Sequence, residues 1–138
     1  MVNISAIPKD MLDSRWDYIK GYICKALAYC NNEMDIDDVY FQIEDGTVIP
    51  LIVEKDGKIL SVVTLEIVQK PLKKMICIMT AGGEELDLWL DEILNVVEIL
   101  AKEQQADSIY INGRKGWLRK LDKYDYKHAY TVLIKEVN

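Results

Sequence analysis

Two adjacent glycines, Gly82 and Gly83, separate two apolar runs of different period. Before them, KKMICIMT is a short apolar run, which is typical of a buried strand. After them, apolar residues recur every three or four positions, as on a helix with one buried face. They are Leu86, Trp89, Leu90, Ile93, Leu94, Val97 and Leu100. The chain must therefore turn from a strand into a long helix here. We expect the next strand, after that helix, to lie parallel to the strand KKMICIMT.

The N-terminal part predicts another long helix, from about Asp10 to Cys30, with Asp10 as its N-cap. Six residues share one face at spacings of three and four: Leu12, Trp16, Ile19, Ile23, Leu27 and Cys30. The segment MDIDDVYFQIEDG after this helix predicts either a short second helix or irregular structure.

Three strands are predicted next, at TVIPLIVEK, KILSVVTLEIV and KKMICIMT. The turn between the first two contains Asp56 and Gly57, a strong signal for a two-residue hairpin. We therefore expect an antiparallel meander. Pro50 has no N–H to donate, which favours an edge position or a bulge in the first of these strands.

The C-terminal part predicts a short strand at DSIYINGR, a short helix at KGWLRKLDKY and a last strand at KHAYTVLIKEV. Trp117, Leu118 and Leu121 are expected to face inward from the short helix, and the last strand to return antiparallel. The resulting fold class is α+β, with a mixed, mostly antiparallel sheet flanked by helices, in a single domain over residues 1–138.

Composition excludes several classes of protein. The net charge of −6 argues against general DNA binding, and no apolar run is long enough to span a membrane. MVNISAIPKD lacks the features of a signal peptide, so we expect a cytoplasmic protein. Cys24, Cys30 and Cys77 have no metal-type spacing, and they are expected to be free, buried thiols. No metal site is predicted, because His128 is the sole histidine.

Charge is divided between two neighbouring segments. Residues 84–103 hold seven acids and one lysine, a net charge of −6, whereas residues 113–127 hold six bases and two acids, a net charge of +4. One interpretation is two solvated surfaces of opposite sign. The other is a basic rim for an anionic ligand or partner.

The order of elements resembles that of the GCN5-related N-acetyltransferases (GNAT), over roughly Thr47 to Val137. The segment GRKGWLRKLDKYDYKHAYTVLIKEV is similar to the C-terminal part of small GNAT-like proteins from tailed bacteriophages, and TAGGEELDLWLDEI resembles their strand-to-helix turn. The resemblance implies a GNAT-like fold. If the chain is encoded by a phage, it implies the host cytoplasm or the virion as its location.

In GNAT enzymes the turn after the fourth strand holds the pyrophosphate of coenzyme A on backbone N–H groups. The resemblance therefore points to Thr80, Ala81, Gly82 and Gly83 as candidates for binding acetyl-CoA. Asn112 is a candidate for a bond to the pantetheine arm, with a turn-forming Asn as its alternative, and Arg114 is a candidate cation if the basic segment reaches the cleft. The usual Gln or Arg of the family's motif is absent, however, since Met79 and Thr80 occupy the corresponding positions. Acids in the first helical turn stabilise a helix and repel a phosphate. A structural turn is thus favoured over a phosphate site, and Glu84, Glu85 or Asp87 should cap the free N–H groups.

GNAT enzymes often use a tyrosine as the acid that protonates the departing thiolate. By resemblance, Tyr124 and Tyr126 are candidates for this acid, and Glu66 is a candidate base. Each has an ordinary packing or surface role as its alternative.

Two functions are consistent with these observations. The first is a GNAT-like phage protein with a degenerate acyl-CoA site, which acts by protein–protein interaction as a virion component or a binder of a host protein, or forms a homodimer. The alternative is an acyl-CoA-dependent N-acetyltransferase. The degenerate glycine turn favours the first, and whether the chain is an enzyme stays open at this point.

Overall fold

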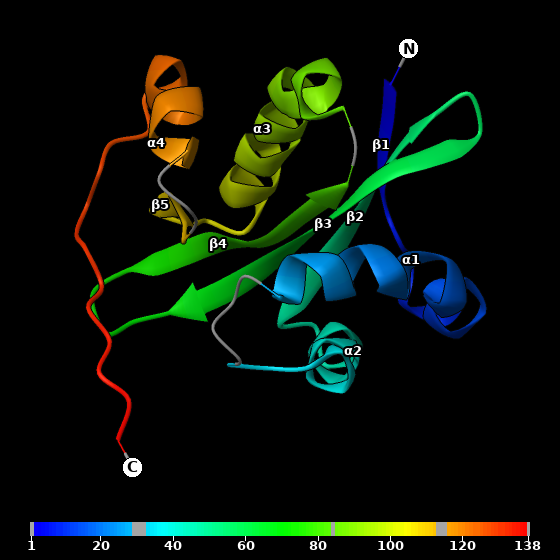
Figure 1. The fold of residues 1–138 in the computed structure, drawn as a ribbon, viewed down its shortest axis with the longest axis horizontal. Coiled ribbons are helices and arrows are strands. Elements are labelled where there is room, and N and C mark those ends of the chain that lie inside the picture. Colours follow the sequence, from blue (N-terminus) through cyan, green and yellow to red (C-terminus); the bar gives the residue numbers. More distant parts are fainter. Residues whose placement is uncertain (1, 29–32, 84, 113–115, 138) are drawn as a thin grey trace.

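The computed structural model describes residues 2–28, 33–83, 85–112 and 116–137. Five strands form one sheet in the order β1-β2-β3-β4-β5 (Figure 1). The strands are β1 (Val2–Ala6), β2 (Val48–Lys55), β3 (Lys58–Gln69), β4 (Lys74–Gly83) and β5 (Ser108–Ile111). The helices are α1 (Leu12–Leu27), α2 (Ile36–Glu44), α3 (Leu86–Glu103) and α4 (Gly116–Leu121). Short 3-10 turns precede α1 at Lys9–Met11 and follow α4 at Asp122–Tyr124.

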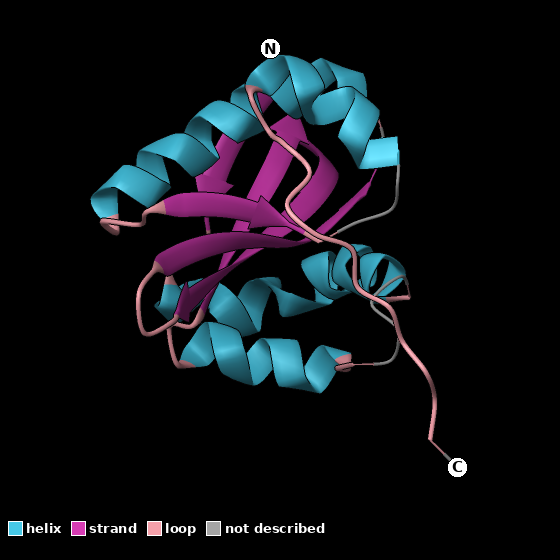
Figure 2. Cartoon of the chain, turned by 90° about the vertical axis from the view of Figure 1, so that its left-hand side faces the viewer, coloured by secondary structure: helices cyan, strands magenta, loops and turns pink. Residues whose placement is uncertain are grey.

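The sheet lies between two layers of helices, with α1 and α2 on one face and α3 and α4 on the other (Figures 1 and 2). Each face has its own core of buried apolar residues. On the α3 side, Trp89, Ile93 and Val97 pack on Leu65 and Ile76. On the α1 side, the core contains Ile19, Ile23, Val39, Ile52 and Val62. The predicted α+β fold class, with helices on both faces of a mixed sheet, is confirmed.

The predicted meander is confirmed. β2, β3 and β4 are consecutive antiparallel neighbours, and β5 pairs with β4 in parallel. Asp56 and Gly57 connect β2 to β3 with φ values of 53° and 78°, as a two-residue hairpin of the primed type requires. The long helix also has its predicted apolar face, although Leu86 and Leu100 at its two ends are only half-buried.

The N-terminal region differs from the prediction in three places. Val2–Ala6, for which no strand was predicted, pairs with β2. Pro50 therefore lies in an inner strand, where the pairing with β1 ends, and its carbonyl accepts a bond from the N–H of Ile7 at 3.4 Å. Asp10 is not an N-cap, because it lies inside the 3-10 turn that precedes α1.

The segment with two open interpretations after α1 is helical. Asp35 is the N-cap of α2, and its side chain accepts a bond from the N–H of Asp38 at 3.0 Å while the Asp38 carboxylate accepts from the N–H of Asp35 at 2.9 Å. This reciprocal capping box starts the helix.

The predicted last strand is not formed. Residues 127–137 have no regular structure, and within the described chain no backbone hydrogen bond joins them to a neighbouring segment. After the second 3-10 turn, Asp125 has a left-handed conformation with φ of 67°. The chain then passes the β5 edge as a loop and ends on the α1–α2 side of the sheet (Figures 1 and 2). A strand is stable only with a neighbour to pair with, so β propensity alone does not form one here.

Three smaller expectations are corrected. Leu118 is 52% exposed, while Leu121 is buried and Trp117 packs on the α3-side core. Cys24 is exposed and Cys77 is half-buried, so neither is a fully buried thiol, and Cys30 lies outside the described residues.

The helices of the described chain include none long and apolar enough to cross a membrane. Its His, Cys, Asp and Glu side chains form no cluster suited to a metal ion.

Candidate functional site

The candidate site lies where β4 and β5 separate. The two strands pair only from Met75 opposite Ser108 to Ile78 opposite Ile111, although β4 continues to Gly83. The register of β4 against β3 passes from Ile78 to Thr80, which leaves Met79 as the extra residue of a β-bulge. A bulge bends its strand and ends regular pairing. The bulge at Met79 therefore lies directly after Ile78, the last residue of β4 that pairs with β5, and β4 continues beyond the end of β5.

The glycine pair belongs to the strand. Gly82 and Gly83 pair with Val62 and Ser61 of β3. The residue just before α3, Glu85, has a left-handed conformation, with φ of 56° and ψ of 44°. Helix α3 begins at the next residue, Leu86. Only residues 84 and 85 connect strand to helix, and residue 84 lies outside the described chain.

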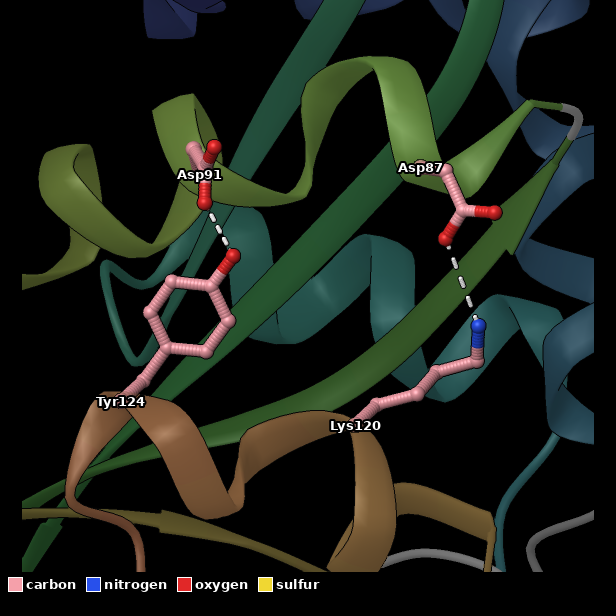
Figure 3. A network of polar contacts seen from close by, with 4 residues as sticks. All are labelled: Asp87, Asp91, Lys120 and Tyr124. Carbon is pink, nitrogen blue, oxygen red and sulfur yellow. Dashed lines mark hydrogen bonds and ion pairs between the residues drawn. The ribbon is translucent and has the colours of Figure 1, made fainter.

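Of the acids predicted to cap α3, the two that the structure describes, Glu85 and Asp87, make no capping bond. Glu85 occupies the N-cap position and makes no side-chain capping bond. Asp87 instead contacts Lys120 of α4, with 3.4 Å between Oδ1 and Nζ (Figure 3). The third predicted cap, Glu84, is outside the described residues. The first turn of α3 thus carries N–H groups that neither Glu85 nor Asp87 caps, beside negative charge that favours the helix dipole and disfavours a bound anion.

The basic segment faces the acidic helix. Lys120 contacts Asp87, and the hydroxyl of Tyr124 donates a hydrogen bond to Asp91 of α3 (Figure 3). Beyond the opposite charges of the two segments, nothing in the sequence indicated that Asp91 and Lys120 would be these partners. Lys120 therefore helps to balance the acids of α3. Arg114, the candidate cation for acetyl-CoA, lies outside the described residues.

Two of the other cofactor candidates have structural roles. The hydroxyl of Thr80 is buried and hydrogen-bonds that of Thr64, while Ala81 packs on the α3-side core. Asn112 is exposed after β5, and its Nδ2 lies 3.9 Å from Sγ of Cys77. Burial, with a smaller contribution from Glu66, raises the pKa of Cys77 to about 11. The Cys77 thiol is therefore protonated at neutral pH and is a poor nucleophile.

The catalytic candidates are divided between the two faces of the sheet. Tyr124 and Tyr126 pack against the α3-side core. Glu66 lies on β3 between Leu65 and Ile67, which both face α3, so its side chain points to the α1 side. A base at Glu66 and an acid at either tyrosine cannot act on one substrate through the sheet.

Neither tyrosine is well suited to donate a proton. The hydrogen bond to Asp91 raises the pKa of Tyr124. Burial raises the pKa of Tyr126 to about 12, and its hydroxyl is buried with no hydrogen-bond partner among the described residues. A higher pKa weakens an acid.

A small apolar cavity lies between the sheet, α3 and α4. It has a volume of about 20 Å³, and its walls include Val63, Ala81, Trp89, Ile111 and Trp117. This is room for about one water molecule, and the lining offers no polar partners. The cavity is a gap in packing and cannot hold part of a coenzyme.

Solved structures of acetyltransferases superpose on the whole chain. An aminoglycoside acetyltransferase from an uncultured soil metagenomic sample matches with a TM-score of 0.76 and 10% identity, covering 100% of this chain and 99% of the other. A predicted acetyltransferase from Clostridium acetobutylicum, solved with acetyl-CoA, gives 0.71 and 17%, covering 100% and 96%. A GCN5-related N-acetyltransferase from Ralstonia eutropha gives 0.70 and 12%, covering 99% of each.

The chain has the GNAT fold. No protein-family model and no curated protein sequence matches it. At these identities the superposition shows the fold and not the activity.

The charges of the residues described at this turn oppose a bound pyrophosphate. A pyrophosphate at the start of α3 would lie beside the carboxylates of Glu85 and Asp87. Among the described residues, the basic side chain in contact there is Lys120, and it is already paired with Asp87. Each carboxylate would oppose the ligand by about 1 kcal/mol at a solvated distance of about 4 Å. What remains in favour of a ligand is the end of the β4–β5 pairing at Ile78 and the N–H groups at the start of α3.

Proposed function

We propose that this chain uses the GNAT fold as a scaffold for binding another protein chain and not for acyl transfer. The observation that carries the proposal is the exposed apolar segment at residues 127–137. Leu133 and Val137 are 90% and 93% exposed, and Tyr130, Val132 and Ile134 are each more than half exposed. A contiguous exposed apolar stretch of this kind marks a surface that is covered by a partner.

The candidate site also supports this proposal, because its residues are poorly suited to acyl transfer. The catalytic candidates are separated by the sheet, and the residues described at the pyrophosphate turn are acidic. Conversely, nothing about protein binding requires a cation at the start of α3. The resemblance of residues 113–137 to small GNAT-like phage proteins supports a virion component or a host protein as the class of partner.

A thermal-shift titration with acetyl-CoA tests this proposal. A ligand at about 100 times its dissociation constant adds roughly 2.7 kcal/mol of stability, which raises the melting temperature by several degrees. We expect no shift. The matched variant Glu85→Gln with Asp87→Asn removes two negative charges from the turn without changing its shape. A micromolar affinity for acetyl-CoA in the unchanged chain, with acetyl transfer to an amine, would overturn the proposal.

The alternative function is an acyl-CoA-dependent N-acetyltransferase. The end of the β4–β5 pairing next to the Met79 bulge favours it, as does the fold shared with a structure solved with acetyl-CoA. Under this alternative the double variant would bind acetyl-CoA more tightly than the unchanged chain. If the turn is structural only, the variant loses a few tenths of a kcal/mol from the helix dipole and gains no affinity.

A further inference from the structure

We propose that residues 128–136 of one copy add as an antiparallel strand to β5 of a second copy, and that two copies exchange these segments reciprocally. This inference rests on the proposed protein-binding function and names the partner as a second molecule of this chain. It assigns a use both to the unpaired C-terminal segment and to the open edge of the sheet.

The receiving edge is β5. It is the last strand of the sheet, and β4 is its only paired neighbour in the described chain. Proteins protect an exposed edge with charges, proline or a bulge. Ser108–Ile111 contains no charged residue and no proline, and its pairing with β4 is regular. β5 therefore presents backbone donors and acceptors to an incoming strand.

The incoming segment has the composition of a strand. Residues 129–134, AYTVLI, contain no charge and three β-branched residues. In an extended conformation Tyr130, Val132 and Ile134 would lie on one face, with Thr131 and Leu133 on the other. Placed beside β5, the first set extends the apolar surface formed by Ile109 and Ile111. The second set pairs with Ser108 and Tyr110 of the opposite face.

β5 is a better match than β1, the other edge. The segment starts at Tyr126, whose side chain packs on the same core as Ile109 and Ile111, and whose N–H donates to the carbonyl of Leu121 at 3.4 Å. The segment thus leaves the fold next to β5. When two copies face each other across their β5 edges, each C-terminal segment has only a short distance to cover to reach β5 of the other copy.

The course of the chain favours a second copy over the molecule's own β5. The left-handed turn at Asp125 directs residues 127–137 past the edge, toward the α1–α2 side of the sheet (Figures 1 and 2). A two-fold axis between two copies would place each such segment beside the other's edge. Exchange of an identical element is a low-cost route to a closed dimer, because both edges are covered at once.

The first test is the mass in solution, by light scattering after size exclusion. We expect the full chain to be a dimer that dissociates on dilution. Val132→Lys with Ile134→Lys should give a monomer that keeps the melting behaviour of a folded chain, because both side chains are exposed in the single molecule. Phe41→Lys, at an exposed position of α2, is the matched control and should stay dimeric. A full chain that is monomeric at all concentrations, or a dimer that survives the double variant, would overturn the inference.

The second test distinguishes exchange from pairing within one chain. In a background with Cys24, Cys30 and Cys77 replaced by serine, one preparation carries Tyr110→Cys and another carries Thr131→Cys. Mild oxidation of the mixture should give a covalent dimer of the two. A chain with both substitutions that closes on itself as a monomer, with no cross-link in the mixture, would refute exchange.

The two proposals fail separately. A monomeric chain that does not bind acetyl-CoA overturns the strand exchange and leaves the proposed function standing. Acetyl transfer by the chain overturns the proposed function, whatever its mass in solution.

Discussion

The two edges of the sheet show opposite outcomes for two segments that both contain strand-forming residues. At one edge, Val2–Ala6 forms β1 and pairs with β2 along its whole length. At the other, residues 127–137 carry the stronger strand pattern and pair with nothing in the described chain. The difference lies in the neighbouring elements. The elements that follow Val2–Ala6 hold it beside β2, whereas the turn that precedes residues 127–137 directs them past the β5 edge. A strand needs a neighbouring strand in register. Val2–Ala6, the segment with the weaker pattern, forms a strand because it is held beside β2.

The N-terminal edge is anchored at both ends of β1. Ile7, directly after β1, continues the pairing with a bond from its N–H to the carbonyl of Pro50, and Val2 and Ile4 pack against the α3-side core. The C-terminal segment has one such anchor, Tyr126, at its start. Beyond Tyr126 its apolar side chains are exposed, so burial does not compensate for the entropy of ordering the backbone.

The largest contrast should appear in amide hydrogen exchange. In a dilute sample, where copies are separate, amides of residues 128–136 should exchange at nearly the rate of an unfolded chain. Inner amides of β3, such as those of Val62 and Val63, should exchange only on global unfolding, which costs about 5–15 kcal/mol. Mass spectrometry of peptides from the two regions measures both. Strong protection of residues 128–136 in the dilute sample would mean that the two edges do not differ.

A matched pair of leucine truncations gives the next largest effect. Leu51 is 2% exposed and lies opposite Ala6 of β1, whereas Leu133 is 90% exposed. Leu51→Ala should lower the free energy of unfolding by about 2–5 kcal/mol, because it leaves a cavity in the core. Leu133→Ala should change it by no more than about 0.5 kcal/mol in a dilute sample. Urea unfolding of both variants measures the difference, and equal losses would contradict it.

Much of the fold can be predicted from local signals in the sequence. The change of period at Gly82 and Gly83 located β4 and α3, and Asp56 with Gly57 located the hairpin, because these patterns depend on the nearest residues. β1 was missed because VNISA is short and its pairing with β2 is a contact distant in sequence. The C-terminal strand was wrongly predicted for the same reason, since its pattern is local and its neighbour is not.

The candidate site was predicted less well, because it depends on which face each residue occupies. Glu66 was grouped with Tyr124 and Tyr126 by resemblance, yet the alternation of β3 places it on the other face of the sheet. The acids of the turn were located correctly, but Asp87 contacts Lys120 and not the helix N–H groups. The bulge at Met79 has no signal in the sequence.

Tyr126, the anchor of the C-terminal segment, gives a smaller effect that depends on pH. Burial raises its pKa from its ordinary value of 10.0 to about 12. The folded state thus holds the phenol proton more tightly, so its contribution to stability is fully present below about pH 10 and is lost as the pH rises toward 12. Tyr126→Phe should remove part of this loss of stability at high pH. At neutral pH it should be neutral or stabilising, because the buried hydroxyl lacks a partner among the described residues. Urea unfolding at several pH values measures both effects, and a clear loss of stability at neutral pH would show that the hydroxyl has a partner.

The smallest effect concerns the ion pair that joins α4, beside the open edge, to α3. Lys120 and Asp87 are 3.4 Å apart, but their side chains are 45% and 90% exposed. Water screens such a pair, and holding two long side chains together costs entropy, so their coupling should be about 0.2–1 kcal/mol. A double-mutant cycle with Lys120→Ala and Asp87→Ala measures it, with Lys20→Ala and Asp17→Ala on α1 as the matched cycle for an exposed pair at 3.1 Å. The coupling should fall at high salt, because exposed charges are screened by ions. A coupling well above 1 kcal/mol that resists salt would mean that the pair is buried in solution.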